Sequence, residues 1–180
     1  MGKGGKKAGK KGAKSGGLLG FGACVITVSD RSSAGERPDH SGPRLEKMLR
    51  KAGYDIEESV LVPDDEEVIA TALQMAVRRD IPLVVTTGGT GFTRRDVTPE
   101  ATARVVERRA DALADEMRRV GRKKTKYAPL SRGICGLAAG SLIINLPGSP
   151  KGAAESLEAI LEILPHALGQ LRGSEGHDDA

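Results

Sequence analysis

Short apolar runs rich in β-branched residues alternate along this chain with longer segments of helical character. Such runs are typical of buried strands, and apolar residues three and four positions apart are typical of helices packed on a sheet. The expected strands cover residues 23–29, 54–62, 82–87 and 141–146, and helices are expected after Pro43 to about residue 53 and over 64–79, 98–121 and 151–172. This order predicts an α/β fold, a mostly parallel sheet with helices on both faces.

The expected elements leave several weak points. The helix over 98–121 has a candidate break near Ala110-Asp111, and Pro165 is expected to kink or split the last helix. Residues 30–39 are expected to form a polar loop, residues 122–126 a basic connector, and residues 127–140 an irregular segment.

Residues 86–100 place three glycines directly after the third expected strand. A helix start follows, with Thr98 as the expected N-cap and Pro99 at the first helical position. Strand, glycine turn and helix together point backbone N–H groups at an anion. Two arginines and one aspartate, Asp96, lie in the same turn, so phosphate and a divalent cation both fit it. A plain tight connection is the alternative, but the helix-start signals favour anion binding.

The turn matches neither of two common phosphate-binding motifs. No Gly-Lys-Ser/Thr follows the glycines, which excludes a Walker A loop. Gly89-Thr90-Gly91 begins a dinucleotide fingerprint, but Arg94 stands where the third glycine belongs.

Polar and acidic residues follow each expected strand. The segments concerned are Ser29-Asp30-Arg31, Pro63-Asp64-Asp65, residues 88–96 and Leu146-Pro147-Gly148-Ser149. Because ligands of open α/β sheets bind at the carboxyl ends of the strands, we expect these segments to form one site.

Two carboxylates of that edge, Asp64 and Asp96, are candidates for holding Mg²⁺. Magnesium at a phosphate-transfer site typically takes one or two carboxylates plus phosphate oxygens. Asp64 could instead cap the next helix, and Asp65 competes with it for either role. Asp96 could be a turn residue or a partner of a neighbouring arginine.

Other polar residues give weaker signals. Ser131-Arg132 could hold a phosphate through hydroxyl and guanidinium, although surface polarity explains the pair about as well. The three histidines are scattered without zinc spacing, and Cys24 and Cys135 are expected to be buried thiols. Four aromatic residues in 180 are too few for the stacking platforms of single-strand nucleic-acid binders.

The net charge of +4 comes from the beginning of the chain. Residues 1–14 hold six lysines and no acid, which leaves 22 basic and 24 acidic residues elsewhere. We expect a disordered tail over residues 1–21, one folded domain over 22–172, and a disordered end over 173–180. A nucleic-acid-binding arm is the alternative to a solubilising tail, but nothing else in the chain supports it. No apolar segment is long enough for a membrane span or a signal peptide, so we expect a cytoplasmic protein.

Several separate motifs, in the right order, resemble those of the MogA/MoaB family of molybdenum-cofactor biosynthesis proteins, which also occurs as the G domain of gephyrin. They are Ser29-Asp30-Arg31, Ser41-Gly42-Pro43, Pro63-Asp64, Thr87-Gly88-Gly89-Thr90-Gly91, Arg95-Asp96-Val97-Thr98-Pro99, Leu130-Ser131-Arg132 and Asn145-Leu146-Pro147-Gly148. The resemblance covers about residues 22–172.

This resemblance implies a three-layer α/β/α fold that assembles as a homotrimer. It implies a nucleotidyltransferase that moves AMP from ATP to the terminal phosphate of molybdopterin, with Mg²⁺ as cofactor. The substrates would be ATP and molybdopterin, and a molybdenum-insertion protein would be a partner. Neither a membrane nor a nucleic acid is expected as a partner.

The resemblance also implies site residues. The family's two essential aspartates, catalytic and metal-binding, fall on Asp64 and Asp96, and its pterin-phosphate serine falls on Ser131. The other expected binding residues are Ser29, Asp30, Thr87, Gly88, Gly89, Thr90, Gly91, Pro147 and Gly148. Some MoaB-type members have no settled activity, so a non-catalytic molybdopterin-binding module is the alternative. Arg95-Asp96 and Ser131-Arg132 favour the active branch, whereas the short C-terminus resembles the MoaB-type members in size.

Overall fold

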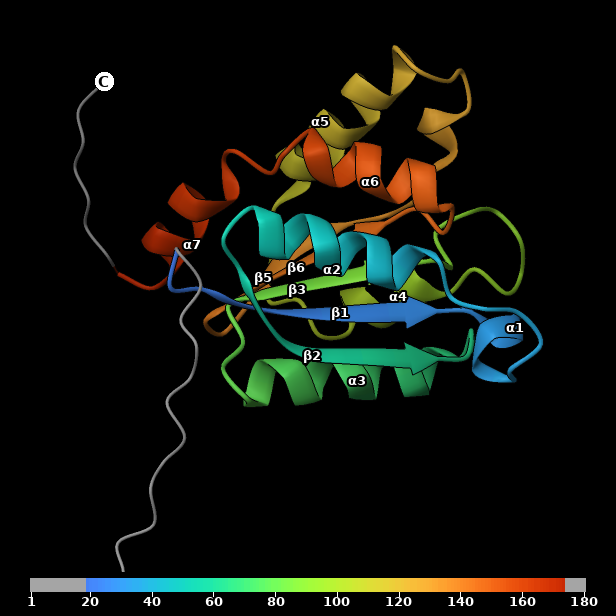
Figure 1. The fold of residues 1–180 in the computed structure, drawn as a ribbon, viewed down its shortest axis with the longest axis horizontal. Helices are drawn as coiled ribbons and strands as arrows, with labels where there is room; N and C mark the ends of the chain where they lie inside the picture. The colour runs from blue at the N-terminus through green and yellow to red at the C-terminus, as the bar shows by residue number, and fades with distance from the viewer. Residues whose placement is uncertain (1–18, 174–180) are drawn as a thin grey trace, which may run out of the picture.

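A computed structural model describes residues 19–173 and shows one six-stranded sheet between layers of helices (Figure 1). The strands are β1 Gly22–Val28, β2 Asp55–Val62, β3 Leu83–Thr87, β4 Arg108–Arg109, β5 Cys135–Ala138 and β6 Ser141–Leu146. Their order in the sheet is β2-β1-β3-β6-β5-β4. Strands β2, β1, β3 and β6 are parallel to one another, whereas β5 is antiparallel to β6 and β4 is antiparallel to β5. The expected α/β fold with a mostly parallel sheet is confirmed.

Helices cover both faces of the sheet. They are α1 Asp30–Ser33, α2 Ser41–Lys51, α3 Glu66–Arg78, α4 Thr98–Ala103, α5 Asp111–Arg122, α6 Pro150–Glu158 and α7 Leu164–Leu171, with a 3₁₀ turn, η1, at Ala128–Leu130. In Figure 1, α2, α5 and α6 lie above the sheet and α3 lies below it. The three layers expected from the family resemblance are therefore present.

Alternate residues of β1 build two separate cores. Ala23 and Val25 pack with Leu45 of α2 on one face, whereas Cys24 and Ile26 pack with residues of α3 on the other. All seven residues of β1 are buried. Burial on both faces explains why this strand reads as a continuous apolar run rather than as an alternating one.

The register of the parallel strands brings their carboxyl ends level. Thr27 of β1 pairs with Thr87 of β3, which pairs in turn with Leu146 of β6. Because the three strands end together, the loops that follow them emerge side by side. This edge of the sheet is where the sequence places its polar segments.

The far edge of the sheet differs from the expectation. The helix predicted over 98–121 ends at Ala103, and the chain resumes as helix at Asp111, where the candidate break near Ala110-Asp111 was expected. Between them, the amides of Glu107 and Ala110 donate to carbonyls of β5 (2.9 Å each), so the intervening residues pair as β4 instead of continuing the helix.

Two other segments also carry more structure than the sequence indicated. Residues 127–140, expected to be irregular, contain η1 and β5. The polar loop over 30–39 begins with α1. The last helix is split as expected, and Pro165 lies in the first turn of α7.

Most of the two predicted tails, 1–21 and 173–180, lies outside the described residues. Residues 19–21, however, belong to the described part. The Leu19 amide donates to the Gly53 carbonyl (3.2 Å), and Phe21 packs against the core beside β1. Leu19 and Phe21 therefore contact the folded domain, because an aromatic side chain has apolar surface to bury there. None of the described helices is both long and apolar enough to cross a membrane.

Among the described residues, one buried side-chain nitrogen or oxygen has no hydrogen-bond partner, the hydroxyl of Tyr54. The residue is 2% exposed, and burial raises its pKa to about 12. A buried hydroxyl without a partner costs free energy that a phenylalanine would not. We therefore expect Tyr54→Phe to increase the free energy of unfolding by about 1 kcal/mol in urea denaturation.

Tyr127→Phe is the matched control, because Tyr127 is 62% exposed. It should change the free energy of unfolding by less than about 0.5 kcal/mol. A clear loss of stability in Tyr54→Phe would show that the hydroxyl has a partner.

Candidate functional site

Two glycines let the chain turn sharply after β3. Gly88 and Gly89 have φ angles of +109° and +62°, which L side chains rarely adopt. A Cβ on Gly88 would also lie 2.1 Å from the carbonyl oxygen of Val28, at the end of β1. The turn therefore passes directly over the neighbouring strand, and any other residue at position 88 would displace it.

The turn presents free donors. The amides of Gly89, Thr90 and Gly91 donate hydrogen bonds to no group within residues 19–173. The carbonyls of Gly88 and Gly89 are used: each accepts a bond from Thr98, Gly88 from the hydroxyl (2.9 Å) and Gly89 from the amide (3.1 Å). Thr98, expected as the N-cap, thus lies within the first turn of α4, where its hydroxyl fixes the glycines instead.

Asp64 is held by main chain at the end of β2. The amide of Asp30 donates to Asp64 Oδ2 (2.8 Å), and the amide of Asp64 donates to Asp30 Oδ1 (2.9 Å). Asp65, not Asp64, caps α3 by accepting from the Val68 amide (3.0 Å). The capping role considered for Asp64 therefore belongs to its neighbour.

Both carboxylates lie against the glycine turn. Asp64 Oδ1 is 3.2 Å from where a Cβ on Gly89 would stand, and Asp96 Oδ2 is 3.0 Å from the same point on Gly91. Asp96 Oδ2 also accepts from the Thr93 amide (2.8 Å). Each carboxylate thus has one oxygen bonded to main chain, and its Oδ1 accepts no hydrogen bond within the described chain.

The two aspartates of the β1 and β2 ends differ in acidity. Burial is the main cause that raises the pKa of Asp64 above 3.8, and the charges of Asp30 and Asp96 raise it further. The pKa of Asp30 is lowered, chiefly because Arg95 Nε donates to its Oδ2 (2.9 Å). Of these two carboxylates, Asp64 is therefore the one whose negative charge the protein compensates less.

Two cavities flank the turn and share Gly89, Gly148 and Ser149 as a common wall. The larger, about 620 Å³, has charged and polar walls, including Asp64 and Arg37. The smaller cavity, about 360 Å³, is lined by polar residues and also by apolar side chains such as Met117.

The predicted site residues divide between these cavities. Ser29, Asp30, Asp64 and Gly88 line the larger cavity, Thr90, Gly91, Asp96, Ser131 and Pro147 line the smaller, and Gly89 and Gly148 line both. Thr87 lines neither, because it is buried and its hydroxyl donates to the Pro147 carbonyl (2.7 Å). Thr87 thereby joins the end of β3, where the glycine turn begins, to the loop that follows β6.

Asn145, which the sequence analysis placed in a family motif but not among the site residues, organises the wall of the smaller cavity. Its side-chain Nδ2 donates to the hydroxyls of Thr86 and Thr102 (3.1 and 2.9 Å), and its Oδ1 accepts from the Ile134 backbone amide (3.2 Å). A lone asparagine inside the apolar run 141–146 was a signal that could have been read.

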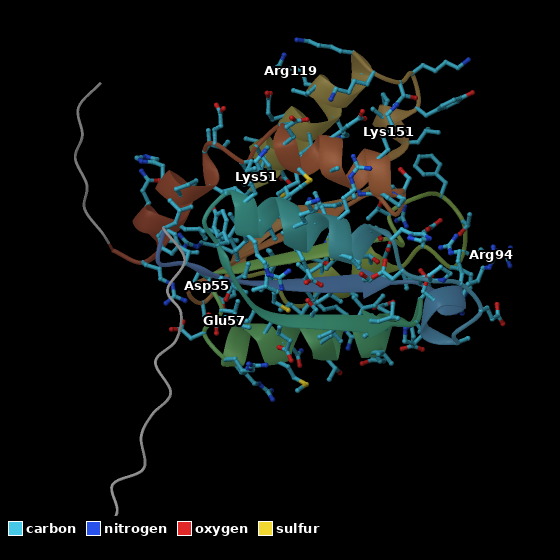
Figure 2. The ribbon with its side chains drawn as sticks, in the orientation of Figure 1. Lys51, Asp55, Glu57, Arg94, Arg119 and Lys151 are labelled. Atoms are coloured by element: carbon cyan, nitrogen blue, oxygen red, sulfur yellow. The ribbon has the colours of Figure 1, made fainter. Side chains whose placement is uncertain are left out.

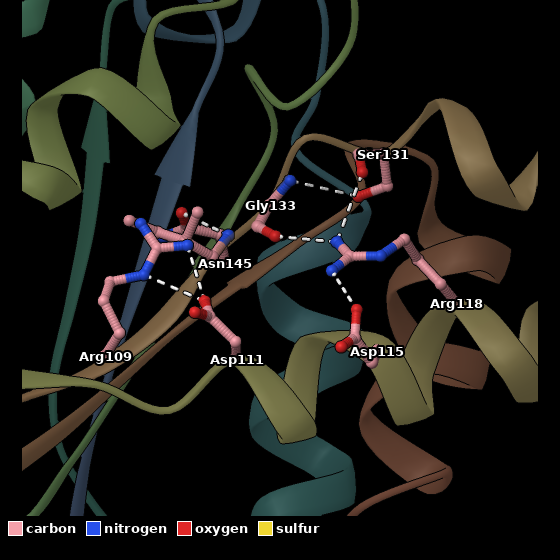
Figure 3. A network of polar contacts seen from close by, with 8 residues as sticks. Arg109, Asp111, Asp115, Arg118, Ser131, Gly133 and Asn145 are labelled. Atoms are coloured by element: carbon pink, nitrogen blue, oxygen red, sulfur yellow. Dashed lines mark hydrogen bonds and ion pairs between the residues drawn. The ribbon is translucent and has the colours of Figure 1, made fainter.

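Arg118 is the second such residue (Figure 3). From α5 it donates to the carbonyls of Ser131 and Gly133 (3.4 and 3.0 Å) and pairs with Asp115 (2.8 Å). It thereby fixes the segment that carries Ser131. Nothing in the sequence distinguishes it from the neighbouring arginines of the same helix.

Arg132 does not point a free guanidinium at a ligand. It donates to the carbonyl of Gly91 (2.6 Å), to the carbonyl of Asp96 and to the carboxylate of Glu100. Its suggested role as a phosphate ligand is therefore not supported. Arg94, in contrast, lies at the outer end of this edge, where its side chain extends outward (Figure 2).

The chemistry of the donors fits a hard cation. Two carboxylate oxygens, Oδ1 of Asp64 and Oδ1 of Asp96, are open beside the turn, and Mg²⁺ prefers oxygen ligands. No three His, Cys, Asp or Glu side chains group as a metal site in the part of the chain that is described. Protein side chains would thus supply only part of a coordination shell.

Similar proteins were found by sequence and by structure. A sequence profile described as "Probable molybdopterin binding domain" matches residues 24–166. A molybdopterin adenylyltransferase from Haemophilus influenzae is 41% identical over 139 residues, which cover 76% of this chain and 71% of that protein. The crystal structure of the molybdopterin biosynthesis enzyme MoaB from Thermus thermophilus superposes with a TM-score of 0.81 at 45% identity, over 85% of this chain and 97% of that one.

Longer proteins match as well. The molybdenum cofactor synthesis protein cinnamon from Drosophila melanogaster is 39% identical over 146 residues, or 80% of this chain and 24% of cinnamon. The chain spans between 22% and 51% of the length of four such curated relatives. The profile match over most of the domain, together with the relatives of similar length, shows that this chain belongs to the molybdopterin-binding domain family of molybdenum-cofactor biosynthesis proteins.

Proposed function

We propose that this protein is a molybdopterin adenylyltransferase that works in molybdenum-cofactor biosynthesis. An oxygen of the terminal phosphate of molybdopterin would attack the α-phosphorus of ATP. The bond between this oxygen and the α-phosphorus forms, the bond from the α-phosphorus to the bridging oxygen breaks, and pyrophosphate leaves. The observation that carries the proposal is that Asp64 and Asp96 lie against one glycine turn whose amides are free.

The proposal assigns the turn to the phosphates of ATP. Three unpaired amides in a row, at Gly89, Thr90 and Gly91, are the donors that an anionic oxygen requires. Negative charge grows on the bridging oxygen as pyrophosphate leaves, and preorganised amides stabilise such charge. Ser29, Asp30 and Gly88 would shape the larger cavity around the same ligand.

The smaller cavity would take the other substrate. The Ser131 hydroxyl would donate to the terminal phosphate of molybdopterin, while Pro147 and Gly148 would border the pocket. Apolar side chains in the same wall suit a flat ring system. The common wall of the two cavities would place the attacking oxygen beside the phosphates on the turn.

Asp64 and Asp96 would hold Mg²⁺ through their open Oδ1 atoms. When bound, magnesium neutralises phosphoryl oxygens and orients them for in-line attack. The protein keeps both carboxylates in place by main-chain hydrogen bonds and keeps Arg95 paired with Asp30.

A non-catalytic molybdopterin-binding module is the second candidate. Its support is the resemblance to MoaB-type members, because some of these have no settled activity. Incubation with Mg-ATP and molybdopterin separates the two candidates. Formation of adenylylated molybdopterin with pyrophosphate supports the enzyme, whereas binding without product supports the module.

The same proposal includes a homotrimer, a cytoplasmic location and a molybdenum-insertion protein as partner. Family membership is what supports these three statements.

Removing either carboxylate should abolish turnover. We expect Asp64→Asn and Asp96→Asn each to lower kcat by at least about 100-fold, because an amide oxygen carries no charge to hold the cation. The measurement is pyrophosphate release, with circular dichroism to show that the fold is intact. Asp65→Asn is the matched control: it preserves the cap of α3, and activity should stay unchanged. Full activity in either site variant would remove the assigned role.

The pKa values of Asp30 and Asp64, which are hydrogen-bonded to each other, should lie on opposite sides of 3.8. In a titration followed by carboxyl ¹³C NMR, Asp64 should titrate above this value and Asp30 below it. As pH falls, Asp64 of the metal-free protein should thus be protonated before Asp30. Arg95→Ala should raise the pKa of Asp30, because the guanidinium is the main cause of its depression. An unchanged Asp30 titration in that variant would contradict this account.

A further inference from the structure

Arg132 connects the two segments that carry Asp96 and Ser131. Its backbone amide donates to the Thr90 carbonyl (2.9 Å), which places the residue beside the glycine turn. Its Nε donates to the Gly91 carbonyl (2.6 Å), and its Nη2 donates to the Asp96 carbonyl. One side chain therefore holds both ends of the segment 91–96.

The rest of the guanidinium is held from α4. Nη1 donates to Glu100 Oε1, and Nη2 lies 3.4 Å from Glu100 Oε2. This contact is the main cause that lowers the pKa of Glu100. With every nitrogen bonded to protein, the guanidinium has no edge turned to a phosphate.

The segment 91–96 has little other support. Within it, Thr93 and Asp96 bond to each other, by the Asp96 amide to the Thr93 carbonyl (3.1 Å) and the Thr93 amide to Asp96 Oδ2 (2.8 Å). These bonds fix the shape of the tip but not its position. Arg95 ties the segment to Asp30 on the side of the larger cavity, so Arg132 is its tie on the side of Ser131.

We propose that Arg132 is a positioning residue that sets the place of Asp96 relative to Ser131 and contacts no substrate. The inference rests on the proposed function, because it gives those two residues their roles. The planar fork of arginine suits two carbonyls several residues apart, and a lysine ammonium cannot reach both in a fixed geometry. A displacement of about 1 Å at a catalytic group can lower the rate on the order of 100-fold.

The first test separates positioning from binding. In Arg132→Ala, kcat of adenylyl transfer should fall by about 10- to 100-fold while KM for ATP and molybdopterin stays nearly constant. Arg132→Lys should be nearly as impaired, and added guanidinium ion should restore part of the activity of the alanine variant only. Arg104→Ala is the matched control, because Arg104 is a half-exposed arginine that pairs with Glu66 and Glu67 outside the site. Its kcat should match wild type.

The second test needs no activity. Amide hydrogen exchange of residues 91–97, measured without ligand, should be faster in Arg132→Ala than in wild type and unchanged in Arg104→Ala. An increase in KM with constant kcat would overturn the proposal and make Arg132 a substrate ligand. Unchanged kcat or unchanged exchange would also overturn it. If wild type forms no product, the proposed function fails, and the exchange experiment alone then decides whether Arg132 holds the segment.

Discussion

The whole edge of the sheet depends on a main-chain crossing that leaves no room for a side chain. Gly88 passes over the end of β1 so closely that a Cβ would stand 2.1 Å from the Val28 carbonyl oxygen. Its amide bonds to the Leu146 carbonyl at the end of β6 (3.2 Å), so three strand ends are joined at one point. The direction of the turn follows from this crossing, and with it the place of the free amides against which both carboxylates lie.

Around that turn, three arginines form ion pairs with other acids, and Asp64 and Asp96 are left without a cationic partner among the described residues. Arg95 is paired with Asp30, Arg132 with Glu100 and Arg118 with Asp115, whereas Asp64 and Asp96 accept hydrogen bonds only from main-chain amides within the described residues. Main-chain donors hold a carboxylate in place without cancelling its charge. The carboxylates of Asp64 and Asp96 are thus ordered, and their negative charge can still attract a cation.

Much of this could be predicted from the sequence because the interactions concerned are local. The buried strands are continuous apolar runs, and β6 begins and ends where expected. What failed was non-local: β4 and β5 are short and exist only because they pair with distant residues. The same limit applies to the site. Two adjacent aspartates look alike in sequence, and only the path of the chain makes Asp65 a cap and turns Asp64 to the glycines. The sequence likewise leaves Arg132 as either a phosphate ligand or a polar surface residue, and its carbonyl partners become known only from the structure.

The wall between the two cavities has a consequence for how such a protein can change. Gly89, Gly148 and Ser149 border both spaces, so a larger side chain at any of these positions would narrow both at once. Under the proposed function, preference for one substrate could therefore not be altered there without altering preference for the other. Independent adjustment is confined to the outer walls, such as Met117 on one side and Arg37 on the other. Divergence within this fold should accordingly accumulate at those outer positions, while the partition itself stays small and invariant.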